Sequence, residues 1–343
     1  MSSSGGRSGF PSRIGGALMR AWQVQARGEP IEVLHSVTLD PPEPAPGQIR
    51  IHVTAAGIGL PDVLMCRHTY PLTPPLPFIP GQEVSGVVTA IGEDVESLVG
   101  DRVMAVTAFL DGFGSFAEEC LAPASSVFPV PEGLADVEAA GFWIPHLTGW
   151  IGLVDRGRLA GGEWLAVLGA GGGSGIAAVQ LGSVLGARVI AVVGDEDRAA
   201  FCRSLGAEAT LDHRDGPLAP ALRELTDGNG ADVIFDPVGG PLAEDAAGAL
   251  ARYGRWLAVG FASGTWPSAE TQQLVWANAT LMGVLAAGYS RAELESIHAS
   301  LAALVGEGGL RNAVTERVPF DELPAALQRM ADRRVIGKMV MVP

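Results

Sequence analysis

The amino-acid sequence predicts an α/β protein with two domains, a barrel-like β domain and a doubly wound parallel sheet. The chain has 343 residues, about two domains' worth at ~150 residues per domain. Short apolar runs divided by Pro/Gly-rich turns fill residues 20–130, and from about residue 147 strand-length and helix-length segments alternate. Hydrophobic residues make up 48% of the chain, which excludes global disorder.

The β half shows its strands as short apolar runs, such as residues 49–54, 84–91 and 102–106. The turns between such runs are marked by proline and glycine, most densely at 40–47 and 70–81. Short strands with frequent breaks are typical of a β-barrel.

The α/β half repeats a strand–helix pattern, which predicts a doubly wound parallel sheet. The predicted strands are residues 164–168, 188–193, 231–235 and 256–260, with helices at 174–185, 197–205 and 242–250. Two helical stretches near 290–306 and 321–332 and a final strand at 338–342 follow.

The charge balance argues against partners that carry phosphate backbones. The net charge is −15, so the surface repels nucleic acids and anionic membranes, and we expect neither as a partner. The uncharged stretch 164–187 is long enough to span a membrane, but its many glycines divide it into strand, turn and helix. Residues 1–18 lack the apolar core of a secretion signal and predict a flexible tail.

The cysteine pattern contains no CxxC pair among the three cysteines, Cys66, Cys120 and Cys202. This argues against a structural zinc lobe and against a disulfide framework, and it fits a reducing cytoplasm.

The strongest chemical signal is a glycine-rich turn between a predicted buried strand and a helix. Glycines there let a pyrophosphate approach the backbone, and the helix N-terminus offers it free N–H groups and a positive dipole end. The alternative is a tight turn without a ligand. The predicted dinucleotide contacts in this turn are Gly169, Ala170, Gly171, Gly172, Gly173, Ser174 and Gly175.

The end of the next predicted strand points to the choice of cofactor. NAD enzymes usually have a carboxylate there for the ribose, but this chain has Val193 and then Gly194. Arg198 follows one helical turn later and could pair with a 2′-phosphate, whereas residues 195–197 are acidic and oppose it. We therefore predict NADPH, with weaker NADH binding, and include Gly194, Asp195 and Arg198 in its site. The alternative for Arg198 is a solvated helix face.

From residue 19 onward the chain resembles the medium-chain dehydrogenase/reductase superfamily, and within it the zinc-free quinone oxidoreductases (zeta-crystallin-like). Besides the glycine turn, the resemblance rests on these segments: AAGIGLPDVLMCRHTYP (55–71), IPGQEVSGVVTAIGEDV (79–95), GDRVMA (100–105), HLTGW (146–150), ADVIFDPVGG (231–240) and DRRVIGKMVMVP (332–343).

The resemblance implies a GroES-like substrate domain over 19–145 and 281–343 and a Rossmann domain over 146–280, with the active site in the cleft between them. Relatives commonly dimerise through the edge strand that corresponds to 280–287, so we expect a homodimer.

The zinc ligands of related alcohol dehydrogenases correspond here to Gly59, Gln82 and Ile144, which are unsuited to zinc. Their proton-relay positions correspond to Pro61 and Leu64. We therefore predict that no metal is bound. Typical quinone oxidoreductases have Asn at position 59 and often Tyr at 64, so the pocket of this chain should be more open and more apolar.

Individual site residues follow from the resemblance, each with a plainer alternative. Thr148 matches a threonine beside the nicotinamide, or else caps a helix. The candidate catalytic residues are Asp62, His146 and Tyr70, for which the alternatives are helix capping, a structural histidine and a packing residue.

Lys338 is the chain's single lysine and lies in a segment that is near the cofactor in relatives, where an ammonium could meet a phosphate. Its alternative is chance on a terminal strand. Val238, Gly260 and Phe261 complete the predicted cofactor contacts.

These features predict a zinc-independent, NADPH-dependent oxidoreductase that reduces a small apolar quinone or α,β-unsaturated carbonyl compound. Two alternatives stay open: an enoyl-thioester reductase, and an NADPH-binding protein without catalysis.

Overall fold

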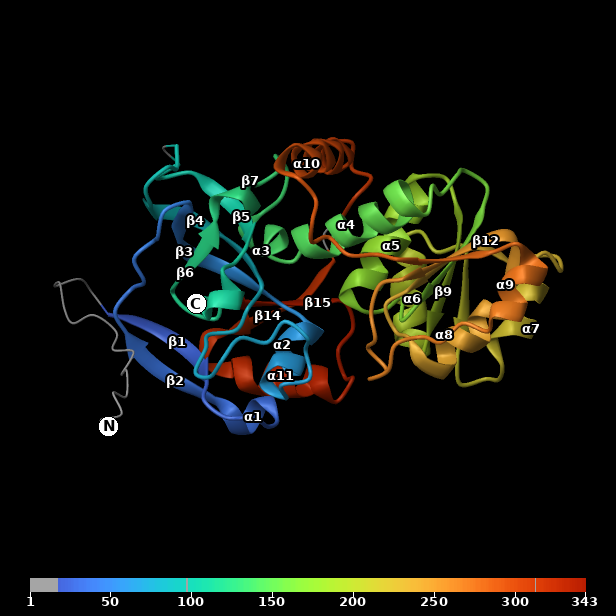
Figure 1. Ribbon diagram of the computed structural model, residues 1–343, viewed down its shortest axis with the longest axis horizontal. Coiled ribbons are helices and arrows are strands. Elements are labelled where there is room, and N and C mark those ends of the chain that lie inside the picture. Colours follow the sequence, from blue (N-terminus) through green and yellow to red (C-terminus); the bar gives the residue numbers. More distant parts are fainter. Residues whose placement is uncertain (1–17, 97, 312) are drawn as a thin grey trace, which may run out of the picture.

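A computed structural model of the protein describes residues 18–96, 98–311 and 313–343, so most of the predicted tail, residues 1–17, lies outside the described residues. A β-rich domain and a parallel-sheet domain lie side by side along the long axis of the molecule (Figure 1). This confirms the predicted α/β class with a β-rich domain and a doubly wound parallel-sheet domain.

The β-rich domain contains a two-stranded antiparallel sheet, β1 (Met19–Val24) and β2 (Leu34–Leu39), and a seven-stranded sheet. The larger sheet has the order β14-β15-β3-β4-β5-β7, with β6 also paired to β3. Its strands are β3 (Gln48–Ile58), β4 (Glu83–Ile91), β5 (Arg102–Val106), β6 (Glu119–Pro123), β7 (Val127–Pro129), β14 (Val314–Pro319) and β15 (Lys338–Val342). The C-terminal strands thus return to the first domain.

The second domain is built on a six-stranded parallel sheet of order β10-β9-β8-β11-β12-β13. The strands are β8 (Trp164–Leu168), β9 (Arg188–Val193), β10 (Ala209–Asp212), β11 (Ala231–Asp236), β12 (Leu250–Ala258) and β13 (Thr280–Gly283). Alternate residues of β8 enter separate apolar clusters, so the sheet is buried on both faces. The strand order reverses between β8 and β11, where doubly wound folds bind ligands.

The helices cover these sheets and connect the domains. They are α1 (Pro30–Val33), α2 (Leu60–Cys66), α3 (Asp136–Ala139), α4 (Trp143–Trp150), α5 (Gly173–Val184), α6 (Glu196–Ser204), α7 (Leu218–Leu225), α8 (Gly240–Ala247), α9 (Thr271–Ala277), α10 (Arg291–Gly306) and α11 (Leu323–Ala331). Helix α4 runs from the β-rich domain into the second domain and continues as a π-helix over Ile151–Arg156 (Figure 1). In the described part of the chain, no helix is long and apolar enough to cross a membrane.

The predicted domain boundaries fall inside two elements. The boundary at 145/146 divides α4, and the boundary at 280/281 divides β13, which pairs with β12 in the parallel sheet. Because a helix and a strand are each continuous, the parallel-sheet domain extends through Gly283, and α4 is shared.

Candidate functional site

The glycine turn follows β8 at the reversal of the strand order and is closed by backbone contacts. A Cβ atom at Gly175 would lie 2.5 Å from the carbonyl oxygen of Gly169, and Gly169 itself has a positive φ of 57°. Helix α5 then begins at Gly173, and its N-cap Gly172 offers no side chain to the first N–H groups. The turn therefore presents an uncapped helix N-terminus, which attracts an anion.

The loop after β11 borders the same turn, and the loop after β12 packs against the loop after β11. A Cβ atom at Gly169 would lie 2.8 Å from Val238, and one at Gly260 would lie 2.9 Å from the carbonyl oxygen of Pro237. Phe261 follows Gly260, and its ring lies 4.6 Å from that of Trp266. The structure thus brings Val238 against the glycine turn and Gly260 against the loop that carries Val238.

Helix α4 carries Thr148 along the parallel sheet. Gly152, one turn later on the same face, lies against Phe235 of β11, where a Cβ atom would be 2.9 Å from the ring. Thr148 is half-buried and lies one turn closer to the N-terminus of α4. The face of α4 that carries Thr148 is therefore turned toward β11, one of the two strands between which the strand order reverses.

The ring of His146 is buried and has a structural partner. Its Nδ1 lies 2.8 Å from the carbonyl oxygen of Phe142, so Nδ1 must donate and Nε2 is left as an acceptor. Burial lowers the pKa of His146 to about 4, which keeps the ring neutral at pH 7. These contacts favour the alternative of a structural histidine over a proton donor.

Asp62 is buried at the start of α2 and binds two backbone N–H groups. Gly59 N–H donates to its Oδ2 at 2.8 Å, and Gly81 N–H donates to its Oδ1 at 3.1 Å. Burial raises the pKa of Asp62 to about 7, against the opposing effects of these donors and of Lys338. The predicted capping role is confirmed by these bonds, and a catalytic role stays a prediction.

Tyr70 lies on the loop after α2 and packs against the core of the β-rich domain. Burial raises the pKa of its phenol, so the hydroxyl stays protonated at neutral pH. Its catalytic role also stays a prediction.

The raised pKa of Asp62 predicts a pH-dependent stability. A carboxyl whose pKa is higher in the folded state than in the unfolded chain stabilises the fold below about pH 4, and this contribution is lost as the pH rises to about 7. For Asp62→Asn, we expect unfolding midpoints whose difference from wild type shrinks between pH 4 and 7 and is constant above. The free energy of unfolding of wild type should fall relative to that of the variant by at most about 1.4 kcal/mol per pH unit. Parallel curves for the two proteins would contradict the raised pKa.

The three positions that correspond to zinc ligands lie close together but do not fit the metal. Asp62 links Gly59 to Gly81, which precedes Gln82, and Glu83 accepts a hydrogen bond from Ile144 N–H at 2.9 Å. Glycine and isoleucine offer no ligating side chain, and an amide is a poor ligand for zinc. Across residues 18–96, 98–311 and 313–343, no group of three His, Cys, Asp or Glu side chains could hold a metal.

Arg198 lies over the glycine turn with its guanidinium group already bonded. A Cβ atom at Gly171 would lie 2.9 Å from the Arg198 side chain, and Asp195 both caps α6 and pairs with the guanidinium. Nη2 donates to the carbonyl oxygens of Arg333 and Val335, each at 2.9 Å. The alternative of a solvated helix face is therefore wrong: Arg198 joins the turn to the C-terminal segment.

Lys338 lies at the junction of the two domains, but its ammonium meets a carboxylate. Nζ lies 2.9 Å from Oε2 of Glu83, and both side chains are buried. Burial raises the pKa of Glu83, and Lys338 opposes that rise. The predicted contact of Lys338 with a phosphate stays a prediction.

Sequence reasoning missed Glu83 and His213. Glu83 is part of the GQEVSG segment, but its partner lies 255 residues away and nothing in the sequence signals the pair. The ring of His213 lies over Gly194, where a Cβ atom would be 2.9 Å from Nε2. His213 directly follows β10, and because parallel strands end at one edge of the sheet, that position was the available signal.

Comparison with known proteins identifies the family. Residues 45–132 match the alcohol dehydrogenase GroES-like domain, and residues 173–303 match the zinc-binding dehydrogenase domain. The chain is 33% identical to a quinone oxidoreductase-like protein 2 homolog of Nematostella vectensis, over 86% of this chain and 81% of that protein. The chain belongs to the quinone oxidoreductase-like family of the medium-chain dehydrogenases/reductases. It is therefore an oxidoreductase of this type, although its residues do not fit the zinc after which the second matched domain is named.

Two solved structures resemble the chain over nearly its whole length. A probable oxidoreductase from Mycobacterium abscessus is 37% identical, has a TM-score of 0.85, and matches 96% of this chain and all of that one. The Escherichia coli quinone oxidoreductase complexed with NADPH is 26% identical, has a TM-score of 0.87, and matches 94% of this chain and all of that one.

Proposed function

We propose that the protein binds NADPH and reduces a quinone or an α,β-unsaturated carbonyl compound without a metal. The observation that carries this proposal is the N-terminus of α5, which has no side-chain cap. It directly follows the tightly packed glycine turn, at the point where the strand order reverses. The E. coli relative was solved with NADPH, which supports the same cofactor here.

The residues present fit a dinucleotide that lies across the carboxyl ends of the parallel strands. The pyrophosphate would lie at residues 169–175, where the N–H groups of α5 are free of side-chain caps. The adenosine end would lie beside Gly194, Asp195 and Arg198 at the end of β9, with His213 adjacent. The nicotinamide would lie beside Thr148 and the loops that carry Val238, Gly260 and Phe261.

Arg198→Ala is expected to weaken NADPH binding by about ten- to thirtyfold and to leave NADH binding nearly unchanged. Only NADPH carries the 2′-phosphate that a guanidinium group at the end of β9 would pair with. Fluorescence titration of both cofactors measures the effect. Arg203→Ala is the matched control, because Arg203 lies on the same helix but pairs with Glu196. Equal weakening of both cofactors would show that Arg198 acts through the turn and the C-terminal segment instead.

The acceptor class follows from what the site can offer a carbonyl oxygen. NADPH supplies the hydride when bound, and the site residues do not fit a metal that could polarise an unactivated carbonyl. A quinone or conjugated enone spreads the resulting negative charge over its own π system. Backbone N–H groups or an ordered water can then stabilise the oxygen.

The test is NADPH oxidation with a simple quinone and a simple enone, with and without a metal chelator. We expect turnover that the chelator does not change. Turnover only with a carrier-bound or coenzyme-bound enoyl thioester would favour the enoyl reductase alternative. Tight NADPH binding without turnover of any acceptor would favour the non-catalytic alternative. One equivalent of zinc in the purified protein, lost together with activity, would overturn the metal-free proposal.

We also propose a homodimer that forms through the free edge of the parallel sheet. In the described residues β13 pairs only with β12, and apolar side chains near this edge are exposed, including Trp276 at 77% and Leu285 at 68%. An unpaired strand beside exposed apolar groups is a ready surface for a second copy.

The cysteines are buried free thiols, which is compatible with the reducing cytoplasm that we propose as location.

A further inference from the structure

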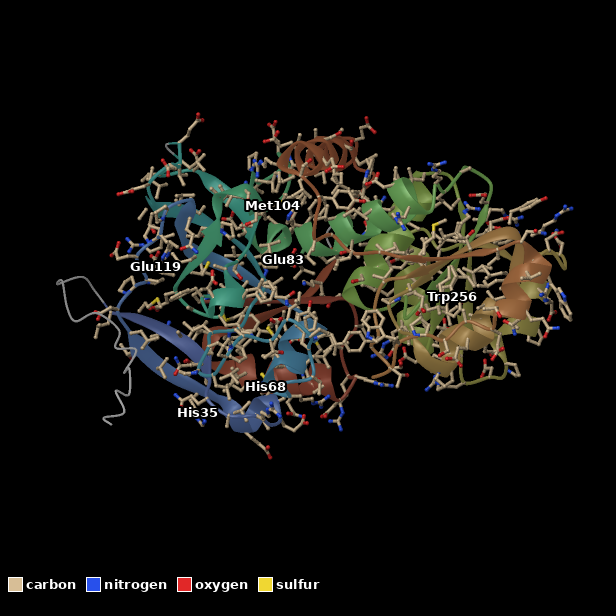
Figure 2. The ribbon with its side chains drawn as sticks, in the orientation of Figure 1. His35, His68, Glu83, Met104, Glu119 and Trp256 are labelled. Carbon is tan, nitrogen blue, oxygen red and sulfur yellow. The ribbon has the colours of Figure 1, made fainter. Side chains whose placement is uncertain are left out.

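A buried ion pair links two strands of the seven-stranded sheet, β4 and β15, beside the candidate site. Lys338, on β15, is 7% exposed, and its Nζ lies 2.9 Å from Oε2 of Glu83, which is 2% exposed. Figure 2 shows Glu83 at the inner side of the β-rich domain, toward α4. Burying two charges is costly, so a pair kept here calls for a role.

The Glu83 carboxylate also caps the helix that carries Thr148. Its other oxygen, Oε1, accepts the hydrogen bond from Ile144 N–H at 2.9 Å, in the first turn of α4. The N-cap residue Phe142 provides no side-chain acceptor of its own. A carboxylate at this end also interacts favourably with the helix dipole. One carboxylate oxygen of Glu83 therefore holds the start of α4, and the other oxygen binds Lys338.

The lysine side chain passes between three glycines on three different segments. A Cβ atom at Gly57 of β3 would lie 2.8 Å from Oε2 of Glu83 and 3.2 Å from Cε of Lys338. One at Gly141, before α4, would lie 2.8 Å from Cγ, and one at Gly173, the first residue of α5, would lie 3.7 Å from Cδ. Side chains at Gly57 and Gly141 would collide with the pair, whereas Gly173 is at ordinary contact distance. The lysine stem thus reaches the N-termini of α4 and α5 at once.

The segment before Lys338 is bonded to the glycine turn as well. Gly337 N–H donates to the carbonyl oxygen of Gly171 at 2.9 Å, and Arg198 bonds to Arg333 and Val335. The turn, the C-terminal strand and the start of α4 are therefore held in one connected set of polar contacts.

We propose that Glu83 and Lys338 are positioning residues for hydride transfer. Their ion pair holds the N-terminus of α4, and with it Thr148, at a fixed place relative to the N-terminus of α5. This inference rests on the proposed function, in which Thr148 borders the nicotinamide and α5 borders the pyrophosphate. Loss of the pair would let the two ends of the cofactor site shift against each other, and a displacement of about 1 Å can cost on the order of a hundredfold in rate.

The test compares Lys338→Met, Glu83→Gln and the double variant with wild type. Each single change leaves one buried charge without its partner, so we expect both to be destabilised, whereas the double variant should recover much of the loss. The hydride-transfer rate, measured in single turnovers at saturating NADPH and acceptor, should fall roughly ten- to hundredfold in all three. The Kd of NADPH should stay within about threefold of wild type, because the ammonium is engaged by Glu83.

Arg255→Met provides a matched control. It removes a partly buried ion pair to Glu163, which directly precedes β8 and so lies at the amino ends of the strands, away from the candidate site. We expect a lower unfolding midpoint with an unchanged hydride-transfer rate.

Two outcomes would overturn the inference. Recovery of the rate together with stability in the double variant would show a purely structural pair. A tenfold or larger rise in Kd for both NADPH and NADH in Lys338→Met would show direct phosphate binding instead.

Failure of the proposed function would look different, since wild type itself would then reduce no acceptor. Hydrogen exchange of the NADPH-bound protein tests the pair in that case. The amides of residues 143, 144 and 146 should exchange faster in the double variant while those of β8 are unchanged, and equal exchange in both proteins would overturn the positioning role.

Discussion

Gly175→Ala is expected to raise the Kd of NADPH by about a hundredfold or more. A Cβ atom at this position would lie 2.5 Å from the carbonyl oxygen of Gly169 and 2.7 Å from Cα of Ala170. Both neighbours are backbone atoms, so no rotamer change can make room, and the turn has to open. An opened turn moves the free N–H groups of α5 away from the pyrophosphate. Fluorescence titration with NADPH measures the loss.

Gly161→Ala separates this effect from the general cost of replacing a glycine. Gly161 lies just before β8, and a Cβ atom there would have its nearest neighbour, the carbonyl oxygen of Leu185, at an ordinary 3.6 Å. We expect NADPH binding by Gly161→Ala within about twofold of wild type. Unchanged binding by Gly175→Ala would show that the dinucleotide does not use this turn.

The sequence was sufficient for the fold and for the position of the turn, because both depend on local patterns. Strand-length apolar runs, helix-length spacers and glycines at fixed places predict a doubly wound sheet with a ligand-binding turn after β8. The observed β8, turn and α5 follow that prediction closely. The predicted boundaries fall within α4 and β13 because a shared helix and an edge strand leave no mark in composition.

The polar contacts of the site were less accessible to sequence reasoning because they join distant segments. Glu83 and Lys338 are 255 residues apart, and Arg198 reaches carbonyl oxygens 135 and 137 residues away. A motif can place a residue near a cleft, but its partner depends on how segments far apart in the sequence come together. For the same reason the sequence could not decide whether His146 is a proton donor or a structural histidine. Its burial and its bond to Phe142 favour the structural role.

Activated acceptors are expected to exceed simple alcohols and ketones in kcat/KM by about a thousandfold or more. A Lewis acid at a carbonyl oxygen is worth several kcal/mol, and each ~1.4 kcal/mol is a factor of about ten in rate. The residues at positions 59, 82 and 144 do not fit a metal, so a saturated ketone finds no such stabilisation, nor does an alcohol in the reverse direction. Steady-state rates with a quinone, an enone, the matching saturated ketone and ethanol measure the ratio.

The same reasoning predicts a proton that comes mainly from water. His146 is neutral and bonded to Phe142, Asp62 accepts two backbone N–H groups, and the pKa of Tyr70 is raised by burial. We expect His146→Ala, Asp62→Asn and Tyr70→Phe each to lower kcat by roughly tenfold or less, whereas removal of a dedicated general acid costs about a hundredfold or more. A loss of that larger size in a variant that still binds NADPH would identify the donor. Rapid oxidation of ethanol would contradict the metal-free site itself, because an unactivated alcohol needs a group that lowers its pKa, and the described residues offer none suited to that task.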